Sequence, residues 1–213
     1  GRFQNTLWDY SHHVVPPLSS TVTYRLDTSV RGARGFTQYG QEVEEGESPI
    51  YIYDRLDEPT RGMLEQNLAY AESAEAAVCF ASGMAAISAA VGVCAKAGEK
   101  VLAHHVLYGC TFSLLKNWLP RFGIKANGID LTDRESLLEH LTDDVRVVYF
   151  ETPVNPDLRL VDIEEVVSIV GKVNENRAEE DRVKVVVDNT FATPYCQRPL
   201  EMGVDLVVGS LTK

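Results

Sequence analysis

Short apolar runs alternate with helical patterns from about residue 60 onward, and this alternation restricts the fold more than any other feature. The runs cover residues 77–81, 101–103, 145–150, 183–187 and 206–208. They are short for buried helices, and they lack the polar alternation of a strand with one wet face. We therefore expect strands buried on both faces, as in an α/β domain with a mostly parallel sheet.

Two segments of this region have helical periodicity. Leu64, Leu68 and Ala71 share one face of a predicted helix that follows Pro59-Thr60. In the second segment, apolar residues recur at i, i+3, i+4 and i+7, namely Ile163, Val166, Val167 and Val170. The charged stretch from Lys172 to Arg182 that follows is expected to be a solvated surface excursion.

The first fifty residues differ from the rest of the chain. Pro16-Pro17, scattered glycines and the acidic run from Glu42 to Glu47 give no sustained period. We expect residues 1–50 to form an extended N-terminal arm and residues 51–213 to form the main domain. Such an arm buries little surface by itself, so it should order against another subunit or another part of the protein.

Charge and cysteine content limit the partners and the compartment. The net charge of −11 argues against nucleic acid or an anionic membrane surface as the main partner. Residues 76–95 carry no charge and are long enough to span a bilayer, but Ser82-Gly83 interrupts them, so a buried strand turning into a helix fits better. The four cysteines form no CxxC pair and no zinc-like group with histidine. Free thiols, no metal site and, without a secretory signal pattern, a cytoplasmic location are therefore predicted.

An acid and a lysine follow two of the predicted strands. Asp188 ends one buried run, and Lys213 follows the last run together with Ser210 and Thr212. Pyridoxal phosphate needs an amine for its aldehyde, an acid beside its pyridine nitrogen and donors around its phosphate. Each residue alone fits an ordinary strand-end acid or an exposed lysine, but the paired context favours a pyridoxal phosphate site.

Other candidate residues lie in loops at the predicted carboxyl edge of the sheet, where open α/β sheets bind ligands. Ser82-Gly83-Met84 begins a predicted helix whose N–H groups suit a phosphate, although such turns are common. Tyr108 is either a core residue or a ring that stacks on a planar cofactor and passes a proton. Asn155 lies between two prolines and offers a hydrogen bond to a cofactor ring. His104 and His105 fit packing or surface positions better than ligand positions.

Together these motifs resemble the cysteine and methionine metabolism family of pyridoxal-phosphate enzymes, the relatives of cystathionine gamma-synthase. The resemblance runs from about Tyr51 to Lys213. It implies the aspartate-aminotransferase-like fold, fold type I, with a three-layer large domain. It also implies a homodimer or homotetramer, because Tyr53 and Arg55 match a tyrosine and an arginine that reach the phosphate of a neighbouring subunit. From the residues alone, Arg55 fits either a phosphate or a surface salt bridge.

The resemblance implies a role for each candidate residue. Lys213 holds the aldehyde of the cofactor and later moves the α proton of the substrate, while Asp188 pairs with the pyridine nitrogen. Tyr108, made more acidic by nearby cationic groups, stacks on the ring and protonates the departing thiolate. The remaining cofactor contacts are Ser82, Gly83, Met84, Asn155, Thr190, Ser210 and Thr212.

Cys110 directs the expectation about the substrate. Glycine is usual at its position in the family, whereas Tyr-Gly-Cys-Thr-Phe at residues 108–112 resembles methionine gamma-lyases. We therefore expect γ-elimination of methionine to methanethiol, ammonia and 2-oxobutyrate, with Cys110 tuning substrate choice. Gamma-replacement by an O-acetylhomoserine sulfhydrylase or cystathionine gamma-synthase stays open, as do cystathionine cleavage and a non-catalytic fragment that acts only in assembly.

The sequence departs from the family pattern in three places. Asp57-Glu58-Pro59-Thr60 replaces the usual Asn-Pro-Thr context, and the stretch from Asn174 to Arg182 resembles an insertion. Family members also continue past the lysine to finish the large domain and add a smaller C-terminal domain, whose arginine binds the substrate carboxylate. We therefore expect an incomplete large domain here.

Overall fold

A computed structural model describes residues 14–39 and 49–213 of the chain. The chain divides into two compact units, residues 1–68 and 69–213. The division falls within helix α2 (Pro59–Glu72), later than the boundary near residue 50 that the sequence suggests. The assignment of residues 1–50 and 51–213 as separate parts stays a prediction.

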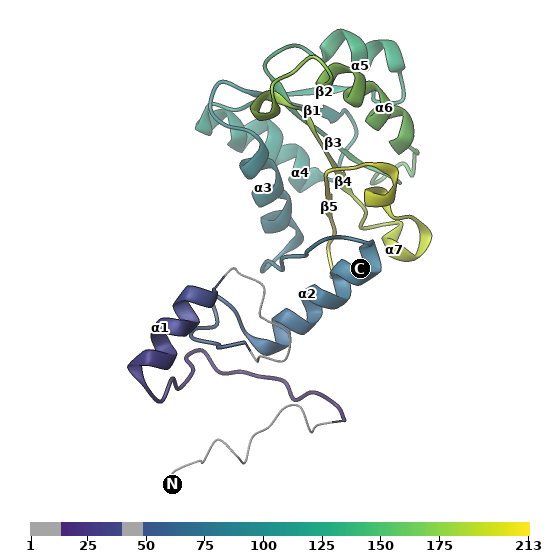
Figure 1. Cartoon of the computed structure of the whole chain (residues 1–213). Coiled ribbons are helices and arrows are strands. Elements are labelled where there is room, and N and C mark those ends of the chain that lie inside the picture. Colours follow the sequence, from purple (N-terminus) through teal and green to yellow (C-terminus); the bar gives the residue numbers. More distant parts are fainter. Residues whose placement is uncertain (1–13, 40–48) are drawn as a thin grey trace. The chain divides into compact units, whose positions relative to one another are not determined.

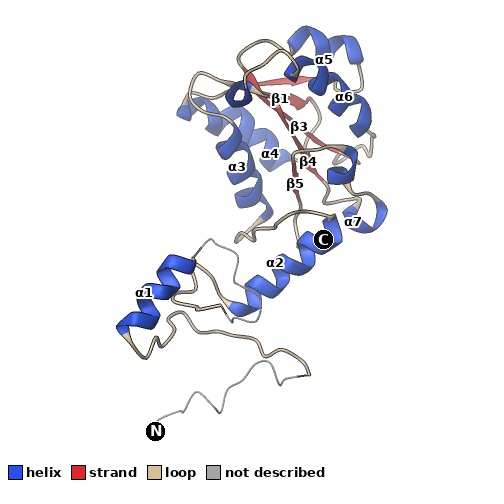
Figure 2. Cartoon of the chain, viewed as in Figure 1, coloured by secondary structure: helices blue, strands red, loops and turns tan. Residues whose placement is uncertain are grey.

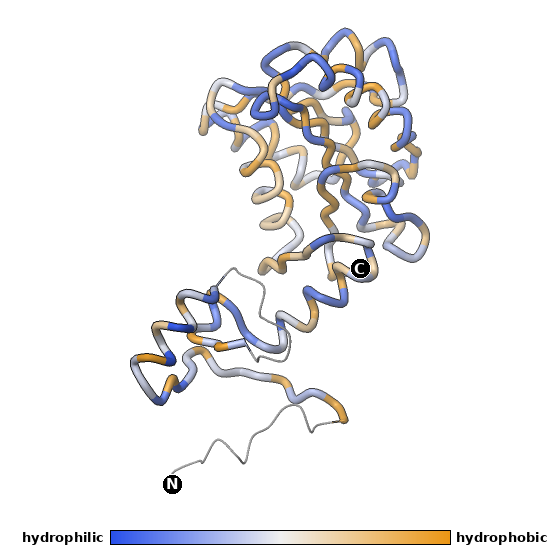
Figure 3. Tube along the Cα trace, in the orientation of Figure 1, coloured by the Kyte–Doolittle hydropathy of each residue, from blue (hydrophilic) through white to orange (hydrophobic). Residues whose placement is uncertain are grey.

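Five parallel strands form the sheet of the second unit (Figures 1 and 2). In the order in which they lie side by side, they are β2 (Lys125–Ile129), β1 (Lys100–His104), β3 (Val145–Glu151), β4 (Lys184–Asp188) and β5 (Leu206–Val208). The predicted strands from residue 101 onward are thus confirmed, and with them the α/β class. The central strands are largely hydrophobic, and so is α3, whereas the segments around α5 are more hydrophilic (Figure 3).

Helices cover both faces of this sheet. Helix α3 (Gly83–Cys94), the π-helix Leu114–Trp118 and the 3₁₀ turn Leu119–Phe122 pack on one face, and α5 (Arg134–His140) and α6 (Ile163–Asn174) pack on the other. Because side chains alternate along a strand, β3 directs Val147 and Tyr149 towards α3 and Val148 and Phe150 towards α6. The shorter helices are α4 (Gly109–Ser113), α7 (Thr193–Cys196) and the 3₁₀ turns Glu179–Asp181 and Pro199–Met202.

Two strand predictions differ from the structure. Residues 77–81 form no strand, and Val78 and Phe80 are largely exposed. A strand needs a neighbour for its backbone N–H and C=O groups, and none of the described strands pairs with this run. Strand β2 was not predicted because only Ile129 of its five residues is buried. As an outer strand of the described sheet, it needs few apolar side chains.

The sequence predicts an extended arm before residue 50, and the structure instead shows a helix there, α1 (Ser29–Gln38). Thr28 caps this helix by accepting a hydrogen bond from the N–H of Arg31 at 3.1 Å. Its glycines lower helix propensity, but Gly35 packs so closely that an added Cβ would lie 2.9 Å from Cγ2 of Ile50. This close packing helps to hold the helix, whose residues are amphipathic over a short span, so its periodicity was missed in the sequence.

The charged stretch from Lys172 to Arg182 is mostly exposed, which fits the predicted solvated surface excursion, but it is anchored at its base. Helix α6 continues to Asn174, whose side-chain amide donates to the carbonyl oxygen of Val183 at 2.9 Å and accepts from its N–H, also at 2.9 Å. The two bonds close the stretch at its base, as a pair of backbone groups would in a strand ladder.

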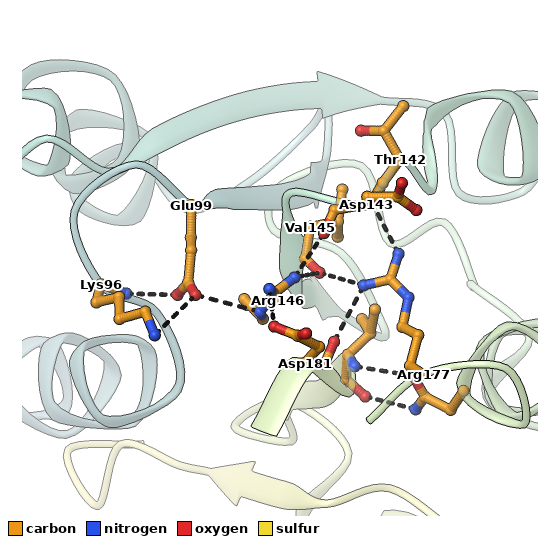
Figure 4. A network of polar contacts seen from close by, with 10 residues as sticks. Lys96, Glu99, Thr142, Asp143, Val145, Arg146, Arg177 and Asp181 are labelled. Carbon is orange, nitrogen blue, oxygen red and sulfur yellow. Dashed lines mark hydrogen bonds and ion pairs between the residues drawn. The ribbon is translucent and has the colours of Figure 1, made fainter. Parts of the chain in front are cut away.

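Arg177 fixes the same stretch to the edge of the sheet where β3 begins (Figure 4). Its guanidinium donates to the backbone oxygens of Thr142 and Val145, each at 2.8 Å, and to that of Asp181 at 3.1 Å. The carboxylate of Asp181 also forms an ion pair with Arg146. A charged sequence thus satisfies partly buried carbonyl groups, which periodicity cannot reveal.

Two further expectations concern membranes and thiols. Of the described helices, none combines the length and the apolar character that crossing a bilayer requires. All four cysteines lie in the described part of the chain and are free thiols, as expected.

Candidate functional site

A cavity of about 230 Å³ lies where the strands of the second unit end. Residues from the ends of β3, β4 and β5, from the start of α3 and from the loop before α4 line it. Ten of the predicted site residues are among them: Ser82, Gly83, Met84, Tyr108, Asn155, Asp188, Thr190, Ser210, Thr212 and Lys213. Five other residues line the cavity and were not predicted as site residues: Ile87, Glu151, Pro153, Phe191 and Gly209.

The N-terminus of α3 approaches the segment after β5 closely. Ser82 caps the helix by accepting a hydrogen bond from the N–H of Ala85 at 3.1 Å. A Cβ added at Gly83 would lie 2.9 Å from Cβ of Ser210, so only glycine fits here without a shift. The first helical turn leaves the N–H groups of Gly83 and Met84 without intrahelical acceptors, which creates an anion-binding position beside the Ser210 hydroxyl.

Thr190 connects this position to the acid at the end of β4. Its N–H donates to Oδ1 of Asp188 at 2.9 Å, and its hydroxyl oxygen accepts from the N–H of Ser210 at 2.8 Å. One residue therefore fixes both, the carboxylate through its backbone N–H and the segment that leads to Lys213 through its hydroxyl.

Asp188 is a half-buried acid with few hydrogen-bond partners. Besides Thr190, its partner is the hydroxyl of Tyr149, which donates to Oδ2 over a long distance of 3.4 Å. Burial raises the pKa of Asp188, and the hydrogen bonds from Thr190 and Tyr149 oppose that shift. Among the residues that the structure describes, no cation forms an ion pair with it. A protonated ring nitrogen would supply the missing charge.

Glu151 is a second acid of the site, and it lies buried beside Asp188. The two residues are register partners on β3 and β4, and Glu151 is only 4% exposed. Its carboxylate accepts the backbone N–H groups of Tyr108 and Asn155 at 2.8 and 3.2 Å. Burial, with a smaller effect of the Asp188 charge, raises the pKa of Glu151 to about 7, although both hydrogen bonds lower it. The sequence signal for Glu151 was its place at a strand end, one strand away from Asp188.

The structure corrects the expected electrostatics of Tyr108. We expected cationic groups to lower the pKa of this phenol, but the Cys110 thiol beside it raises the pKa, first through a hydrogen bond and then through charge. Cys110 is exposed in α4 and is not among the residues that line the cavity. Tyr108 itself is 44% exposed, so its ring is not a core residue.

Tyr53 and Arg55 belong to the first unit. The Arg55 guanidinium carbon lies 5.0 Å from the centre of the Tyr53 ring, within cation–π range. Residues 22–24 pair with this segment, because Tyr24 donates to the carbonyl of Ile52 and the residue pair Thr23 and Tyr53 forms an antiparallel bridge. Their predicted reach to a neighbouring subunit stays a prediction.

A polar network joins the loop after β4 to the loop after β3. Asn189, 2% exposed, donates to Glu72 at 3.4 Å and to the carbonyl of Gln197 at 3.1 Å. The Gln197 amide in turn donates to Asn189 at 2.9 Å and to the carbonyl oxygen of Thr152 at 2.6 Å. These hydrogen bonds hold the loop after β3 and the loop after β4 together.

His104, His105 and Asp130 bring possible metal-ligand atoms within 4.8 Å of one another at the ends of β1 and β2. Nδ1 of His104 already accepts a hydrogen bond from the N–H of Leu131 at 3.2 Å. The expected packing role fits His104, which is fully buried, whose pKa is lowered by burial and whose ring lies against that of His105.

The donor set of the cavity fits a phosphorylated aromatic aldehyde with a basic ring nitrogen. A helix start with free N–H groups and the hydroxyls of Ser210 and Thr212 suits the phosphate. The half-buried carboxyl of Asp188 suits a protonated ring nitrogen, and Lys213 supplies the amine. Any side chain larger than glycine at residue 83 would occupy the space between the start of α3 and Ser210, where the phosphate would bind.

The comparisons with known proteins agree with this chemistry. Residues 4–213 match the family model of the Cys/Met metabolism PLP-dependent enzymes. An L-methionine gamma-lyase of Fusobacterium nucleatum is 42% identical over 197 residues, which are 92% of this chain and 46% of that protein. The cystathionine beta-lyase MetC of Bacillus subtilis is 40% identical over 163 residues, 76% of this chain and 40% of that protein.

A solved structure confirms the fold class. The crystal structure of a proposed O-acetylhomoserine (thiol)-lyase of Campylobacter jejuni superposes with a TM-score of 0.82 at 31% identity, covering 97% of this chain and 46% of that one. That crystal structure carries a pyridoxyl-lysine phosphate. The chain spans about half the length of the curated relatives it matches.

Proposed function

Because the chain belongs to the Cys/Met metabolism PLP-dependent enzymes, we propose that its cavity binds pyridoxal phosphate and that the whole protein is a carbon–sulfur lyase. One observation carries this proposal. The cavity brings together an amine, Lys213, a half-buried acid, Asp188, and the start of α3 closed against Ser210. These groups match the aldehyde, the pyridine nitrogen and the phosphate of the cofactor.

The residues of the cavity take distinct roles in this proposal. Pyridoxal phosphate, when bound, supplies an electron sink for charge that develops next to an amino group. Lys213 holds the aldehyde and moves a proton at the α carbon of the substrate, and Asp188 keeps the ring nitrogen protonated. Tyr108 stacks on the ring and gives a proton to the departing sulfur. Ser82, Gly83, Met84, Thr190, Ser210 and Thr212 bind or orient the phosphate, and Asn155 contacts the ring.

Methionine is the proposed substrate. Its γ-elimination consumes one water and yields methanethiol, ammonia and 2-oxobutyrate, as the C–S bond breaks and the sulfur takes up a proton. The form Tyr-Gly-Cys-Thr-Phe at residues 108–112 supports this choice, as does the name of the Fusobacterium relative. Cys110, which is exposed and raises the pKa of Tyr108, would tune the choice of substrate.

The test is an assay of 2-oxobutyrate and methanethiol from methionine, made with the protein at its full natural length and loaded with cofactor. We expect both products from the wild type and none from Lys213→Ala. Reduction with borohydride before proteolysis should attach the cofactor mass to the peptide that contains Lys213. An absence of both the products and the attached cofactor would contradict the proposal.

Gamma-replacement is the second candidate, because the fold matches a proposed O-acetylhomoserine (thiol)-lyase. Turnover of O-acetylhomoserine with sulfide, without 2-oxobutyrate from methionine, would establish it. Cleavage of cystathionine is tested in the same assay, because a cystathionine beta-lyase is among the relatives. If the wild type never gains a cofactor absorbance band with added pyridoxal phosphate, a non-catalytic role in assembly is the better conclusion.

The proposed assembly is a homodimer or homotetramer in which Tyr53 and Arg55 reach the phosphate of the neighbouring subunit. The pairing of these two side chains with each other supports a preformed cationic contact. Light scattering measures the size of the oligomer. Arg55→Ala should weaken cofactor binding without dissociating the oligomer. The cytoplasmic location stays a prediction.

A further inference from the structure

Glu151 joins two loops that line the cavity. Its Oε1 accepts the N–H of Tyr108 at 2.8 Å, and its Oε2 accepts the N–H of Asn155 at 3.2 Å. Tyr108 precedes α4, whereas Asn155 follows β3. The two backbone groups belong to separate loops, and a single carboxylate with two oxygens satisfies both.

The strand pattern explains why the carboxylate lies at this place. Glu151 is the last residue of β3 and shares a strand face with Tyr149, two positions earlier. It pairs in register with Asp188 at the end of β4. The side chain therefore lies at the end of the sheet, under both loops, and is 4% exposed.

Fold stability alone does not account for an acid here. A buried carboxylate loses its hydration, and hydrogen bonds without a cation recover only part of that loss. The titratable groups that interact with Glu151 are Asp188 from β4, Tyr149 from β3 and Tyr108 from its loop, and Lys213 lines the same cavity. Asp188 adds repulsion. A neutral amide side chain would be easier to bury, but it offers one acceptor oxygen, whereas the carboxylate offers one to each of the two N–H groups.

We propose that Glu151 is a positioning residue whose carboxylate fixes the backbone of Tyr108 and Asn155, so that the phenol and the amide of these residues face the bound cofactor. The catalytic part of this inference rests on the proposed function. The holding of the two loops does not, because it depends only on the two hydrogen bonds. Glu151 itself makes no step of the reaction.

The variants Glu151→Gln and Glu151→Ala test the inference in the cofactor-loaded protein at its full natural length. Gln offers one acceptor oxygen and turns an NH₂ towards the second N–H, whereas Ala offers none. Glu99→Gln is a control for loss of a buried acid elsewhere: Glu99 is 9% exposed, accepts the N–H of Lys96 at 2.8 Å and pairs with Arg146 at 3.2 Å, but it precedes β1 at the opposite edge of the sheet.

Two measurements are made on each variant. Amide hydrogen exchange at Tyr108 and Asn155 should accelerate about tenfold or more in Glu151→Ala, at one of the two sites in Glu151→Gln, and at neither in Glu99→Gln. The kcat for the sulfur amino acid should fall by about 10- to 100-fold in the Glu151 variants, because a misplaced phenol loses its alignment. Cofactor affinity should change less than threefold, as Glu151 makes none of the proposed phosphate contacts.

Unchanged exchange at both amides in Glu151→Ala would overturn the inference, whatever the activity. A loss of kcat that equals the loss in Glu99→Gln would overturn its catalytic part. If the wild type cleaves no sulfur amino acid, the proposed function fails while the exchange data still decide the holding of the loops. If Glu151→Ala does not fold, Glu151→Asp replaces it, since the shorter side chain keeps its charge and reaches only one loop.

Discussion

Gly83 and Ser210 lie in direct contact at the mouth of the cavity, so that a methyl group on Gly83 would lie 2.9 Å from Cβ of Ser210 and 3.2 Å from its hydroxyl oxygen. Gly83 is the first residue of α3, and Ser210 follows β5. The contact joins the anion-binding start of a helix to the segment that carries Lys213. It therefore determines where a phosphate and an amine lie relative to each other.

Gly83→Ala should weaken pyridoxal phosphate binding by about tenfold or more, a loss of about 1.4 kcal/mol, because the methyl group pushes Ser210 out of place. Equilibrium titration by cofactor absorbance measures the effect. Gly92→Ala is the control in the same helix: nothing lies within 4 Å of an added Cβ there, so we expect unchanged affinity and about 0.5–1 kcal/mol more stability. Equal affinity of both variants would contradict the cradle.

Thr190→Val should loosen both the acid and the phosphate side of the site. The change keeps the shape of the side chain but leaves the N–H of Ser210 without the hydroxyl that accepts it at 2.8 Å. A lost acceptor of this kind costs about 1–3 kcal/mol, and cofactor affinity should fall accordingly by at least about fivefold. Thr190→Ser keeps the hydroxyl and should bind like the wild type; a similar loss in both variants would point to packing instead.

The stability of the cofactor-free protein should depend on pH through Glu151. Since the pKa is raised from 4.5 to about 7, the folded state binds more protons than the unfolded state between these values, and the free energy of unfolding falls as pH rises. The fall amounts to about 3 kcal/mol at 1.36 kcal/mol per pKa unit. The stabilising contribution is complete below about pH 4.5 and lost above pH 7.

Glu151→Gln mimics the protonated side chain and removes this titration. Denaturant unfolding at pH 4.5 and pH 8 should therefore show the variant gaining about 3 kcal/mol on the wild type over this interval. Other carboxyls, such as Asp144 with a pKa of about 2, titrate in both proteins and cancel in the comparison. A constant difference at the two pH values would show that Glu151 ionises normally.

Arg177→Ala should destabilise the fold by about 1–3 kcal/mol, because it removes charged donors from the backbone oxygens of Thr142 and Val145, and the Val145 oxygen keeps only its bond from Arg146 at 3.1 Å. Chemical denaturation measures the change. Arg182→Ala is the control in the same stretch: Arg182 pairs with exposed Glu179 at 2.6 Å, and an exposed pair contributes about 0–1 kcal/mol. Equal effects of the two changes would mean that the stretch is not anchored.

The strands of the core and the residues at their ends could be predicted from the sequence because both signals are local. A strand buried on two faces is apolar at every position, and the residue after it lies at the sheet edge whatever its partners are. Asp188 is an example: its run was recognisable, and it lines the cavity as predicted. The same logic failed at residues 77–81, where the apolar run has no described neighbour, and at β2, whose sequence is polar.

Glu151 shows the limit within the site itself. Its position after an apolar run was visible, but its importance depends on two N–H groups from separate loops. The direction of the Tyr108 pKa shift was wrong for the same reason, because the prediction did not include the thiol of Cys110 as its neighbour. Helix α1 likewise depends on a contact of Gly35 with Ile50.

The sequence by itself determined the α/β class, most of the parallel strands and the chemical groups that the carboxyl edge of the sheet offers. Burial and periodicity determine which residue types occur along a segment, so these features can be predicted without knowing which segments pack together. Only the tertiary structure decided that Gly83 touches Ser210, that Thr190 bridges Asp188 to the segment before Lys213, and that Glu151 holds two loops. These contacts arise from strand register and side-chain packing between distant segments, which no local pattern encodes.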